Sequence, residues 1–195
     1  MKLKKCLILG CSPFINEIED FSFIYNYDLS ISINRFDKGK TTHRCAFDSD
    51  TIRWIKNNNC SEKLILNAKS VNFLQGESLL KKEPFFELET HYLFEHSTTI
   101  ILEECGKLYG HKSSAIPAIN YAILQGAKEI YLIGVDFNWN QGHYYSPLKH
   151  EKRQEDLLEL RQNIKQLRNY ADIYRCNPDE SLLLSFLPYK AIGKL

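Results

Sequence analysis

Two histidines and two adjacent tyrosines gather in one short segment, at His143, Tyr144, Tyr145 and His150. The segment 138–150 is rich in turn formers and aromatic residues and has no apolar period, so we expect a loop that serves as a lid. A histidine can accept a proton from a hydroxyl group, and a tyrosine hydroxyl can donate to charge that develops on a phosphate. Each of them alone would suit an ordinary surface. Together they favour general base catalysis combined with phosphate stabilisation.

A second set of polar residues follows the expected strands, at the point where each strand ends. Short amide, carboxylate and hydroxyl groups at such positions can hold the hydroxyls and the base edge of a nucleotide. The same residue types also form turns, which is the alternative for each of them taken singly. Their recurrence after several strands favours a binding site. The set comprises Cys11, Ser12, Asn34, Asp48, Asn67, Ser70, Asp136 and Asn177.

The elements that would position these residues alternate between short apolar runs and helical patterns. The apolar runs are continuous, which is typical of strands covered on both faces in a parallel sheet. The expected strands lie within 6–10, 29–36, 43–48, 63–70, 128–137 and 172–178, and the expected helices within 48–59, 113–127 and 151–171. This order predicts an α/β fold: a single Rossmann-like, doubly wound, mostly parallel sheet with helices on both faces and a short lid loop. The pattern of 71–110 predicts no topology.

The first expected strand ends in a Gly-Cys-Ser-Pro turn, Gly10–Pro13. Ligands of doubly wound sheets bind beyond the carboxyl ends of the strands, so this turn would offer backbone amides and a helix N-terminus to an anion or a nucleotide hydroxyl. It matches neither the dinucleotide fingerprint nor the P-loop pattern. A plain strand-to-helix connection therefore stays an equal alternative to a ligand-binding loop.

Composition indicates one domain without a global charge. The 195 residues suit a single packed domain, 1–195, and 25 basic against 24 acidic residues supply no field that would attract a nucleic acid. The N-terminal apolar run is short and ends in a turn, which indicates a buried strand and a cytoplasmic chain. The six cysteines include no Cys-x-x-Cys pair, and the histidines have no paired ligand spacing. We therefore expect reduced, mostly buried thiols and no metal site.

Three blocks of the sequence resemble glycosyltransferase family 42, the bacterial sialyltransferases, and more distantly proteins related to the motility accessory factor. The opening LILGCSPFINEI is similar to the family's strand followed by Gly-x-Gly-Pro-Ser, and SINRF fits its strand-ending Asn. The block SSAIPAINYAILQGAKEIYLIGVDF is similar to the family's Thr-Ser-Gly helix and the strand that follows it. YRCNPDESLL resembles the family's closing strand, turn and helix.

The resemblance implies a metal-independent, inverting transferase that needs no cofactor. Such an enzyme moves sialic acid or a related keto-sugar acid from a CMP-sugar donor to a glycan acceptor of the lipooligosaccharide type. His150 would be the catalytic base, and Tyr144, joined by Tyr145, would stabilise the departing phosphate. Membrane contact would be peripheral, at the inner membrane through a lipid-linked acceptor, and homo-oligomer formation stays open. The implied substrate-binding residues are Gly10, Cys11, Ser12, Pro13, Asn34, Asp48, Ser113, Ser114, Asp136 and Asn138.

The chain departs from the family pattern in and around this site. Cys11 and Asp48 stand where the family has Asn, Asn138 replaces one phosphate-binding tyrosine, and the lid between Tyr145 and His150 is shorter. These departures leave two alternatives open: a catalytically inactive nucleotide- or sugar-binding protein of the same fold, and a pyrophosphokinase-like enzyme that needs a metal. Acceptor-dependent release of CMP and dependence on magnesium would separate the three hypotheses.

Overall fold

The computed structural model describes residues 4–58, 60–67, 69–70, 100, 102, 107–110, 113–135, 137, 142–145, 154–178 and 184–192, and the backbone of 91–96. Its strands are β1 (Lys4–Leu9), β2 (Leu29–Ile33), β3 (His43–Ala46), β4 (Lys63–Asn67), β5 (His91–His96), β6 (Lys107–Gly110), β7 (Ala127–Ile133) and β8 (Asp172–Arg175). Its helices are α1 (Ser49–Asn57), α3 (Ala115–Leu124) and α4 (Gln154–Leu167), with the 3₁₀ helices η1 (Pro13–Glu17) and η2 (Ser22–Asn26).

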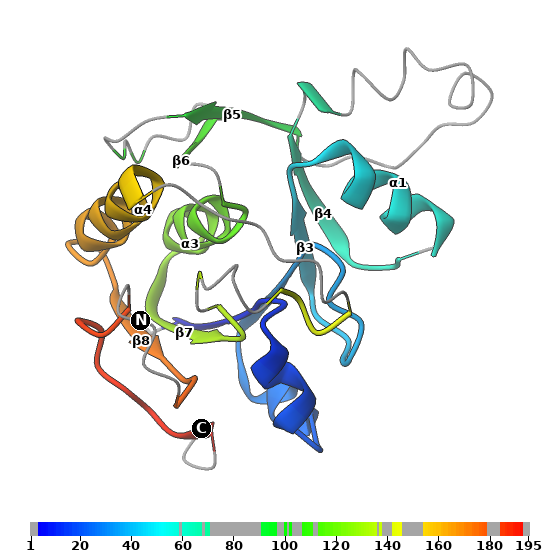
Figure 1. Ribbon diagram of the computed structural model, residues 1–195, viewed down its shortest axis with the longest axis horizontal. Coiled ribbons are helices and arrows are strands. Elements are labelled where there is room, and N and C mark those ends of the chain that lie inside the picture. Colours follow the sequence, from blue (N-terminus) through cyan, green and yellow to red (C-terminus); the bar gives the residue numbers. More distant parts are fainter. Residues whose placement is uncertain are drawn as a thin grey trace.

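The strands form one eight-stranded sheet in the order β6-β5-β4-β3-β2-β1-β7-β8. All neighbouring strands run parallel, so their carboxyl ends lie along the same edge. Figure 1 shows the sheet curving around α3, from β5 and β6 past β4 and β3 to β7 and β8. The predicted α/β, doubly wound sheet is confirmed, and its carboxyl edge is where the predicted site residues must be sought.

Helices cover both faces of this sheet, as predicted. On one face α3 contacts β1, β2, β3, β6 and β7 and packs beside α4 (Figure 1). On the other face α1 covers β3 and β4, whereas η1 and η2 cover β1 and β7. Alternate residues of β1 serve the two sides: Cys6 and Ile8 face α3, and Leu7 and Leu9 face the 3₁₀ helices. This double burial is why the strand is a continuous apolar run.

Local signals determine where the helices beside the carboxyl edge begin and end. The Asp48 carboxylate caps α1 by accepting a hydrogen bond from the Thr51 amide at 2.7 Å. Ser113 Oγ accepts a hydrogen bond from the Ala115 amide at 3.2 Å, at the start of α3. That helix ends before Gly126, whose φ of 86° lies in the left-handed region that favours glycine. Both helices start after the carboxyl end of a strand, β3 and β6 respectively.

Two parts of the fold differ from, or add to, the predicted elements. The helical pattern after the first strand forms the short helices η1 and η2 instead of an α-helix. Ile15 is the only buried residue of η1, so no apolar stripe supports a longer helix there. Strands β5 and β6 occupy part of the segment 71–110, for which the sequence predicted no topology. Of the predicted lid, 138–150, the structure describes 142–145.

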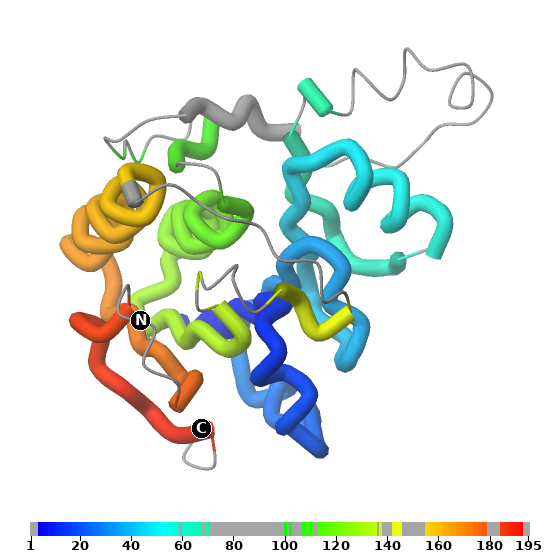
Figure 2. Tube along the Cα trace, viewed as in Figure 1, coloured from blue at the N-terminus to red at the C-terminus, as the bar shows by residue number. Residues whose placement is uncertain are grey.

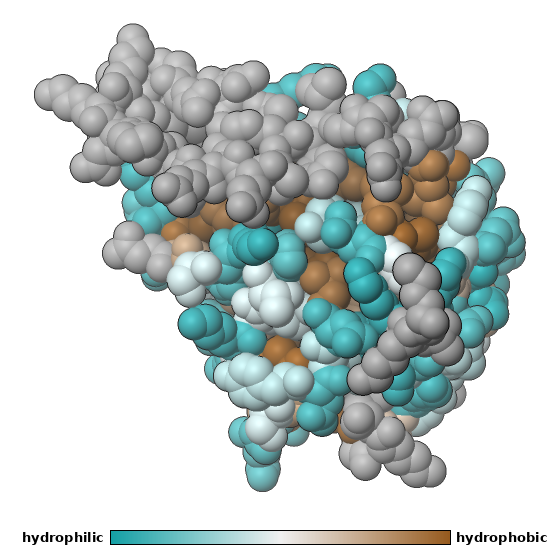
Figure 3. Space-filling view, turned by 180° about the vertical axis from the view of Figure 1, so that it is seen from behind, coloured by the Kyte–Doolittle hydropathy of each residue, from teal (hydrophilic) through white to brown (hydrophobic). Residues whose placement is uncertain are grey.

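Most of the described surface is hydrophilic when the molecule is seen from behind, and hydrophobic side chains gather next to the residues drawn in grey (Figure 3). Among the described helices, none combines the length and the apolar character that crossing a membrane requires. Among the described cysteines, Cys6, Cys11, Cys45, Cys60 and Cys176 are free, and all of these except Cys60 are buried.

Candidate functional site

The loops after β1 and β7 are in direct contact at the carboxyl edge. The Gly10 amide donates to the Ile133 carbonyl at 2.7 Å, and the Ser12 amide donates to the Gly134 carbonyl at 2.9 Å. A Cβ atom on Gly10 would lie 2.2 Å from the Gly134 carbonyl oxygen, so glycine is required here. The prediction that the amides of Gly10 and Ser12 reach a ligand is therefore wrong. They are bonded within the protein because the two loops approach closely.

Asn177, which follows β8, ties the same two loops together. Its Oδ1 accepts a hydrogen bond from the Gly134 amide at 2.7 Å, and its Nδ2 donates to Ser12 Oγ at 3.4 Å. Both Ser12 and Asn177 are buried. Cys11, which precedes Ser12, donates its thiol to the Ile33 carbonyl at 3.1 Å, and burial raises the pKa of this thiol to about 12. The Gly10–Pro13 turn is thus a rigid base for the loops around it.

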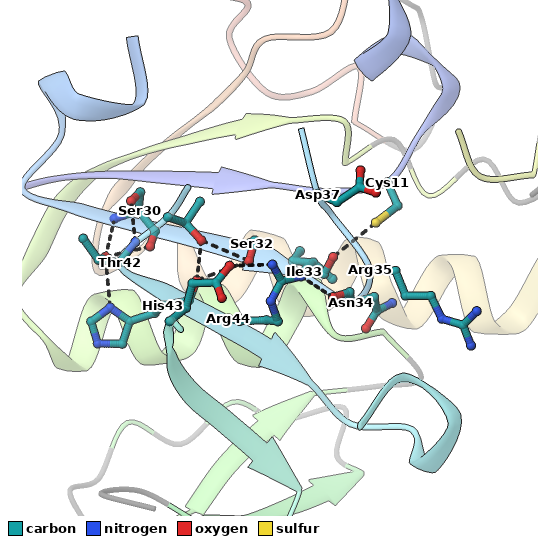
Figure 4. A network of polar contacts seen from close by, with 12 residues as sticks. Cys11, Ser30, Ser32, Ile33, Asn34, Arg35, Asp37, Thr42, His43 and Arg44 are labelled. Atoms are coloured by element: carbon teal, nitrogen blue, oxygen red, sulfur yellow. Dashed lines mark hydrogen bonds and ion pairs between the residues drawn. The ribbon is translucent and has the colours of Figure 1, made fainter. Parts of the chain in front are cut away.

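Asn34, at the end of β2, holds an acceptor that the described residues do not use. Its backbone lies in the left-handed region with a φ of 53°. The Asn34 amide donates to the Cys45 carbonyl at 2.9 Å, and the Asn34 carbonyl accepts from Arg44 Nη1 at 2.7 Å (Figure 4). The side-chain Oδ1 is buried and has no hydrogen-bond partner in the described part of the chain. Such an atom costs about 1–3 kcal/mol unless a donor reaches it, which makes Asn34 a candidate ligand contact.

Arg44 supports the loop after β2, and a carboxylate compensates its charge. Its side chain is 3% exposed and pairs with Glu62 at 2.5 Å. The guanidinium also lies over the Trp54 ring, with Cζ 5.5 Å from the centroid. An arginine buried with its own carboxylate is a structural cation, so it is not available to a ligand.

The described part of the predicted lid, 142–145, is anchored to the loops after β1 and β2 (Figure 2). The Tyr144 amide donates to the Cys11 carbonyl at 3.0 Å. The Tyr144 hydroxyl accepts from the Asp37 amide at 2.8 Å, and its proton can go to Asp37 Oδ1 at 2.6 Å or to the Arg35 carbonyl at 2.9 Å. Burial, and then the Asp37 carboxylate, raise the pKa of Tyr144 above its ordinary value. This hydroxyl holds the segment 142–145 on the loop after β2.

Tyr145 has a more open environment. Its ring is 37% exposed, stacks on His143 with centroids 5.1 Å apart, and meets Tyr144 edge to face. Arg35 Cζ lies 5.8 Å from the ring centroid. Burial raises the pKa of the Tyr145 hydroxyl, with smaller contributions from Cys11 and Asp48 that raise it and from Arg35 that lowers it. The Tyr145 hydroxyl is therefore protonated at neutral pH and can donate a hydrogen bond.

The other predicted residues near the edge mainly make hydrogen bonds at helix starts and within or between loops. Asp48 and Ser113 cap α1 and α3, and the Ser114 carbonyl accepts from the Cys45 thiol at 3.5 Å. Ser70 Oγ donates to the Phe47 carbonyl at 2.6 Å, which joins the loop after β4 to the loop after β3. Their presence at the edge is confirmed by the parallel topology, whereas their contact with a ligand stays a prediction. Asp136, Asn138 and His150 lie outside the described residues.

Sequence reasoning missed three charged residues near Asn34: Arg35 and Asp37 in the loop after β2, and Arg44 in β3. The signal for Arg35 was present, because it directly follows Asn34 in the same strand-ending motif. Nothing local distinguishes Arg44, whose partner Glu62 lies 18 positions away, directly before β4. Within the described residues, no three His, Cys, Asp or Glu side chains come together as a metal site would require.

The sequence matches no protein-family model and no curated protein. Its fold matches solved structures of the sialyltransferase CstII. A CstII variant in complex with CMP matches with a TM-score of 0.52 at 17% identity, over 96% of this chain and 86% of that chain. CstII from Campylobacter jejuni in complex with the substrate analogue CMP-3FNeuAc matches with a TM-score of 0.50 at 17% identity, over 96% and 85%. This chain has a sialyltransferase-like fold.

Proposed function

We propose that this chain is a glycosyltransferase that takes its sugar from a CMP-activated donor bound at the carboxyl edge of the sheet. The fold likeness supports this, since it covers nearly the whole chain and the similar structures were solved with CMP or a CMP-sugar analogue. The position of Asn34 supports it as well. A doubly wound sheet binds its ligand where these strand ends lie.

On the donor side, Asn34 Oδ1 accepts a hydrogen bond from a hydroxyl or amino group of the nucleotide. The atom is held in place because the backbone of Asn34 is bonded on both sides, to Cys45 and to Arg44. Asp48 and Ser114 border the same edge, and Asp136 follows β7. The turn Gly10–Pro13 supports the nucleotide through its surface, since the amides of Gly10 and Ser12 are occupied.

The reaction is a single displacement that inverts the anomeric carbon and uses no metal. His150 takes the proton of the acceptor hydroxyl as the new bond forms, which is general base catalysis. The tyrosines of the lid share two tasks. Tyr144 fixes the lid to the loops after β1 and β2, and Tyr145 donates to the phosphate as it leaves. Lid anchoring keeps water from the donor, which otherwise would be hydrolysed.

The donor sugar is sialic acid or a related keto-sugar acid, and the acceptor is a glycan of the lipooligosaccharide type. We infer this class from the three sequence blocks that resemble the bacterial sialyltransferases. An acceptor attached to a lipid would bring a cytoplasmic enzyme to the inner membrane as a peripheral protein. We also propose that the chain is a member of that family and does not share its fold alone.

The observation that carries the proposal is that Asn34 Oδ1, at the carboxyl edge of a sialyltransferase-like fold, is buried without a hydrogen-bond partner among the described residues. Calorimetric titration with CMP in EDTA tests it, with UMP, AMP and GMP as controls. We expect selective binding of CMP without metal, weakened in Asn34→Ala. Acceptor-dependent release of CMP should disappear in His150→Ala while CMP binding persists.

Two results would overturn the proposal. If no cytidine nucleotide binds, the donor site is absent and the likeness to CstII describes the fold only. If CMP binds but no acceptor promotes its release from a CMP-sugar, the chain is a nucleotide-binding protein of this fold without transferase activity.

A further inference from the structure

Arg35 is a partly buried cation for which the described part of the chain provides no counterion. It directly follows Asn34 at the end of β2, and Figure 4 shows its side chain extending away from the buried Arg44. In the part of the chain that the structure describes, no carboxylate pairs with its guanidinium. Its Cζ lies 5.8 Å from the centroid of the Tyr145 ring.

The nearest acid on the same loop, Asp37, is engaged elsewhere. Its Oδ1 takes the hydrogen bond of the Tyr144 hydroxyl at 2.6 Å, and its amide donates to the same hydroxyl at 2.8 Å. Arg44, nine residues along the chain from Arg35, shows the contrast, because it is buried together with Glu62. A partly buried arginine left unpaired at the ligand edge of a sheet is suited to an anion that comes from outside the chain.

The surroundings of Arg35 favour a phosphate as that anion. A guanidinium presents several N–H donors in one plane, which matches two oxygens of a phosphate. The Tyr145 ring limits the directions in which this plane can turn. The Tyr145 hydroxyl stays protonated, so it supplies another donor beside the guanidinium. Asn34, the neighbouring residue, provides an acceptor and no competing negative charge.

We propose that Arg35 binds the donor phosphate and, with Tyr145, neutralises the charge that appears on it during transfer. This inference rests on the proposed function. In the displacement, the bond between the anomeric carbon and the phosphate oxygen breaks, and its electron pair stays on that oxygen. The acceptor oxygen forms the new bond to the anomeric carbon, and its proton goes to His150. CMP thus leaves with one more negative charge than it carried in the donor, and Arg35 remains protonated throughout.

This role also accounts for a departure noted in the sequence. Asn138 stands where the resemblance would place a tyrosine that donates to the phosphate. Arg35 supplies from the β2 loop the hydrogen-bond donors that this position lacks. A cation acts on the phosphate at longer range than a neutral hydroxyl does, so it does not require the same lid.

Titration of four proteins with CMP and with cytidine, in EDTA, tests the inference. They are the wild type, Arg35→Gln, Arg35→Lys and the control Lys63→Gln, which removes the same charge at the opposite edge of the sheet. We expect the wild type to prefer CMP to cytidine, and Arg35→Gln to lose about ten- to a hundredfold in CMP affinity with cytidine affinity unchanged. Arg35→Lys should retain part of the preference. Lys63→Gln should equal the wild type. Added salt should weaken CMP binding more in the wild type than in Arg35→Gln.

The titrations distinguish a failure of the proposed function from a failure of the role of Arg35. If the wild type binds neither CMP nor cytidine, the proposed function fails. If it binds CMP but Arg35→Gln keeps the same ratio of CMP to cytidine affinity, Arg35 does not bind the phosphate while the nucleotide site stands. Equal loss of both ligands in Arg35→Gln, with an unchanged melting temperature, would also overturn the role, because Arg35 would then support the site rather than contact the phosphate.

Discussion

Arg44 Nη1 donates a hydrogen bond of 2.7 Å to the backbone carbonyl of Asn34, and this bond connects a buried ion pair to the residue that carries the proposed ligand contact. Asn34 has a φ of 53°, a conformation that a non-glycine residue adopts only when its surroundings enforce it. The Arg44–Glu62 pair therefore stabilises the core and sets the direction of the Asn34 side chain at once.

Removal of one member of this pair is expected to destabilise the fold strongly. Glu62→Gln leaves Arg44, which is 3% exposed, as a buried charge without a counterion. We expect a loss of about 3 kcal/mol in the free energy of unfolding, measured by denaturant titration at pH 7. CMP affinity should fall as well, because the Asn34 backbone loses its support.

Two matched variants separate this effect from a general cost of removing charge. Asp50→Asn removes one ion-pair partner of Arg53, whose side chain is 43% exposed, and should cost less than about 1 kcal/mol. The double variant Arg44→Met/Glu62→Leu removes both charges and should be more stable than Glu62→Gln. Equal destabilisation by Glu62→Gln and Asp50→Asn would contradict the assignment of a buried pair.

The contact between the loops after β1 and β7 gives a second prediction. In Gly10→Ala the new methyl group would lie 2.2 Å from the Gly134 carbonyl oxygen, so the two loops must separate. Both hydrogen bonds between them would weaken, and we expect a loss of at least about 3 kcal/mol. Gly126→Ala is the control, because its Cβ would meet only Lys4 Cδ at 3.9 Å and its cost is the backbone strain of a φ of 86°, about 1–2 kcal/mol. If thermal unfolding shows the two variants to be equally stable, the close approach is not present in solution.

Lys190, in the segment after β8, provides a third prediction. Its Nζ lies 3.9 Å from the Tyr174 ring centroid and 4.9 Å from that of Tyr131, and donates to the Tyr131 hydroxyl at 3.1 Å. This lysine fastens the segment 184–192 to the sheet beside a cavity of about 370 Å³. Lys190→Met should lower the free energy of unfolding by about 1 kcal/mol and speed proteolysis of that segment. Lys4→Met, which removes an exposed lysine bonded to the Gln125 carbonyl, should change neither.

Local signals explain which parts of this fold could be predicted from the sequence. β1 is apolar on both faces, so its place in the middle of a covered sheet is visible in its residues. The caps at Asp48 and Ser113 and the helix end at Gly126 are equally local, because each acts on a residue within a few positions. Asn34 was found for the same reason, as a polar residue at a strand end.

Contacts between distant segments could not be predicted in this way. The Tyr144 hydroxyl bonds to Asp37 across 107 positions, and Asn177 bonds to Ser12 across 165. Nothing in the sequence near Gly10 indicates that its amide is taken by Ile133 rather than offered to a ligand. Strands β5 and β6 could not be predicted because the aromatic and acidic residues of 71–110 show neither a helical nor a strand period.

The last prediction is that the hydroxyls of Tyr144 and Tyr145 have different roles. Tyr144→Phe removes the hydroxyl that joins the lid to Asp37 and Arg35, and should lower the free energy of unfolding by about 1–2 kcal/mol at pH 7. The folded-state pKa of Tyr144 lies above its ordinary value of 10.0, so the stability that its neutral form contributes is complete below pH 10 and is lost as the pH rises above it. The gap between wild type and Tyr144→Phe should therefore narrow above pH 10 in denaturant titrations.

Tyr145→Phe is the matched counterpart, since it removes the same atom from the neighbouring residue. Its hydroxyl contributes little to stability at pH 7, because the ring is 37% exposed and keeps its packing on His143 and under Arg35 in the variant. We expect stability within about 0.5 kcal/mol of the wild type, together with a reduced rate of CMP release from the donor. The opposite pattern, a stable Tyr144→Phe and an unstable Tyr145→Phe, would mean that the lid is held by Tyr145 and that Tyr144 is free to meet the phosphate.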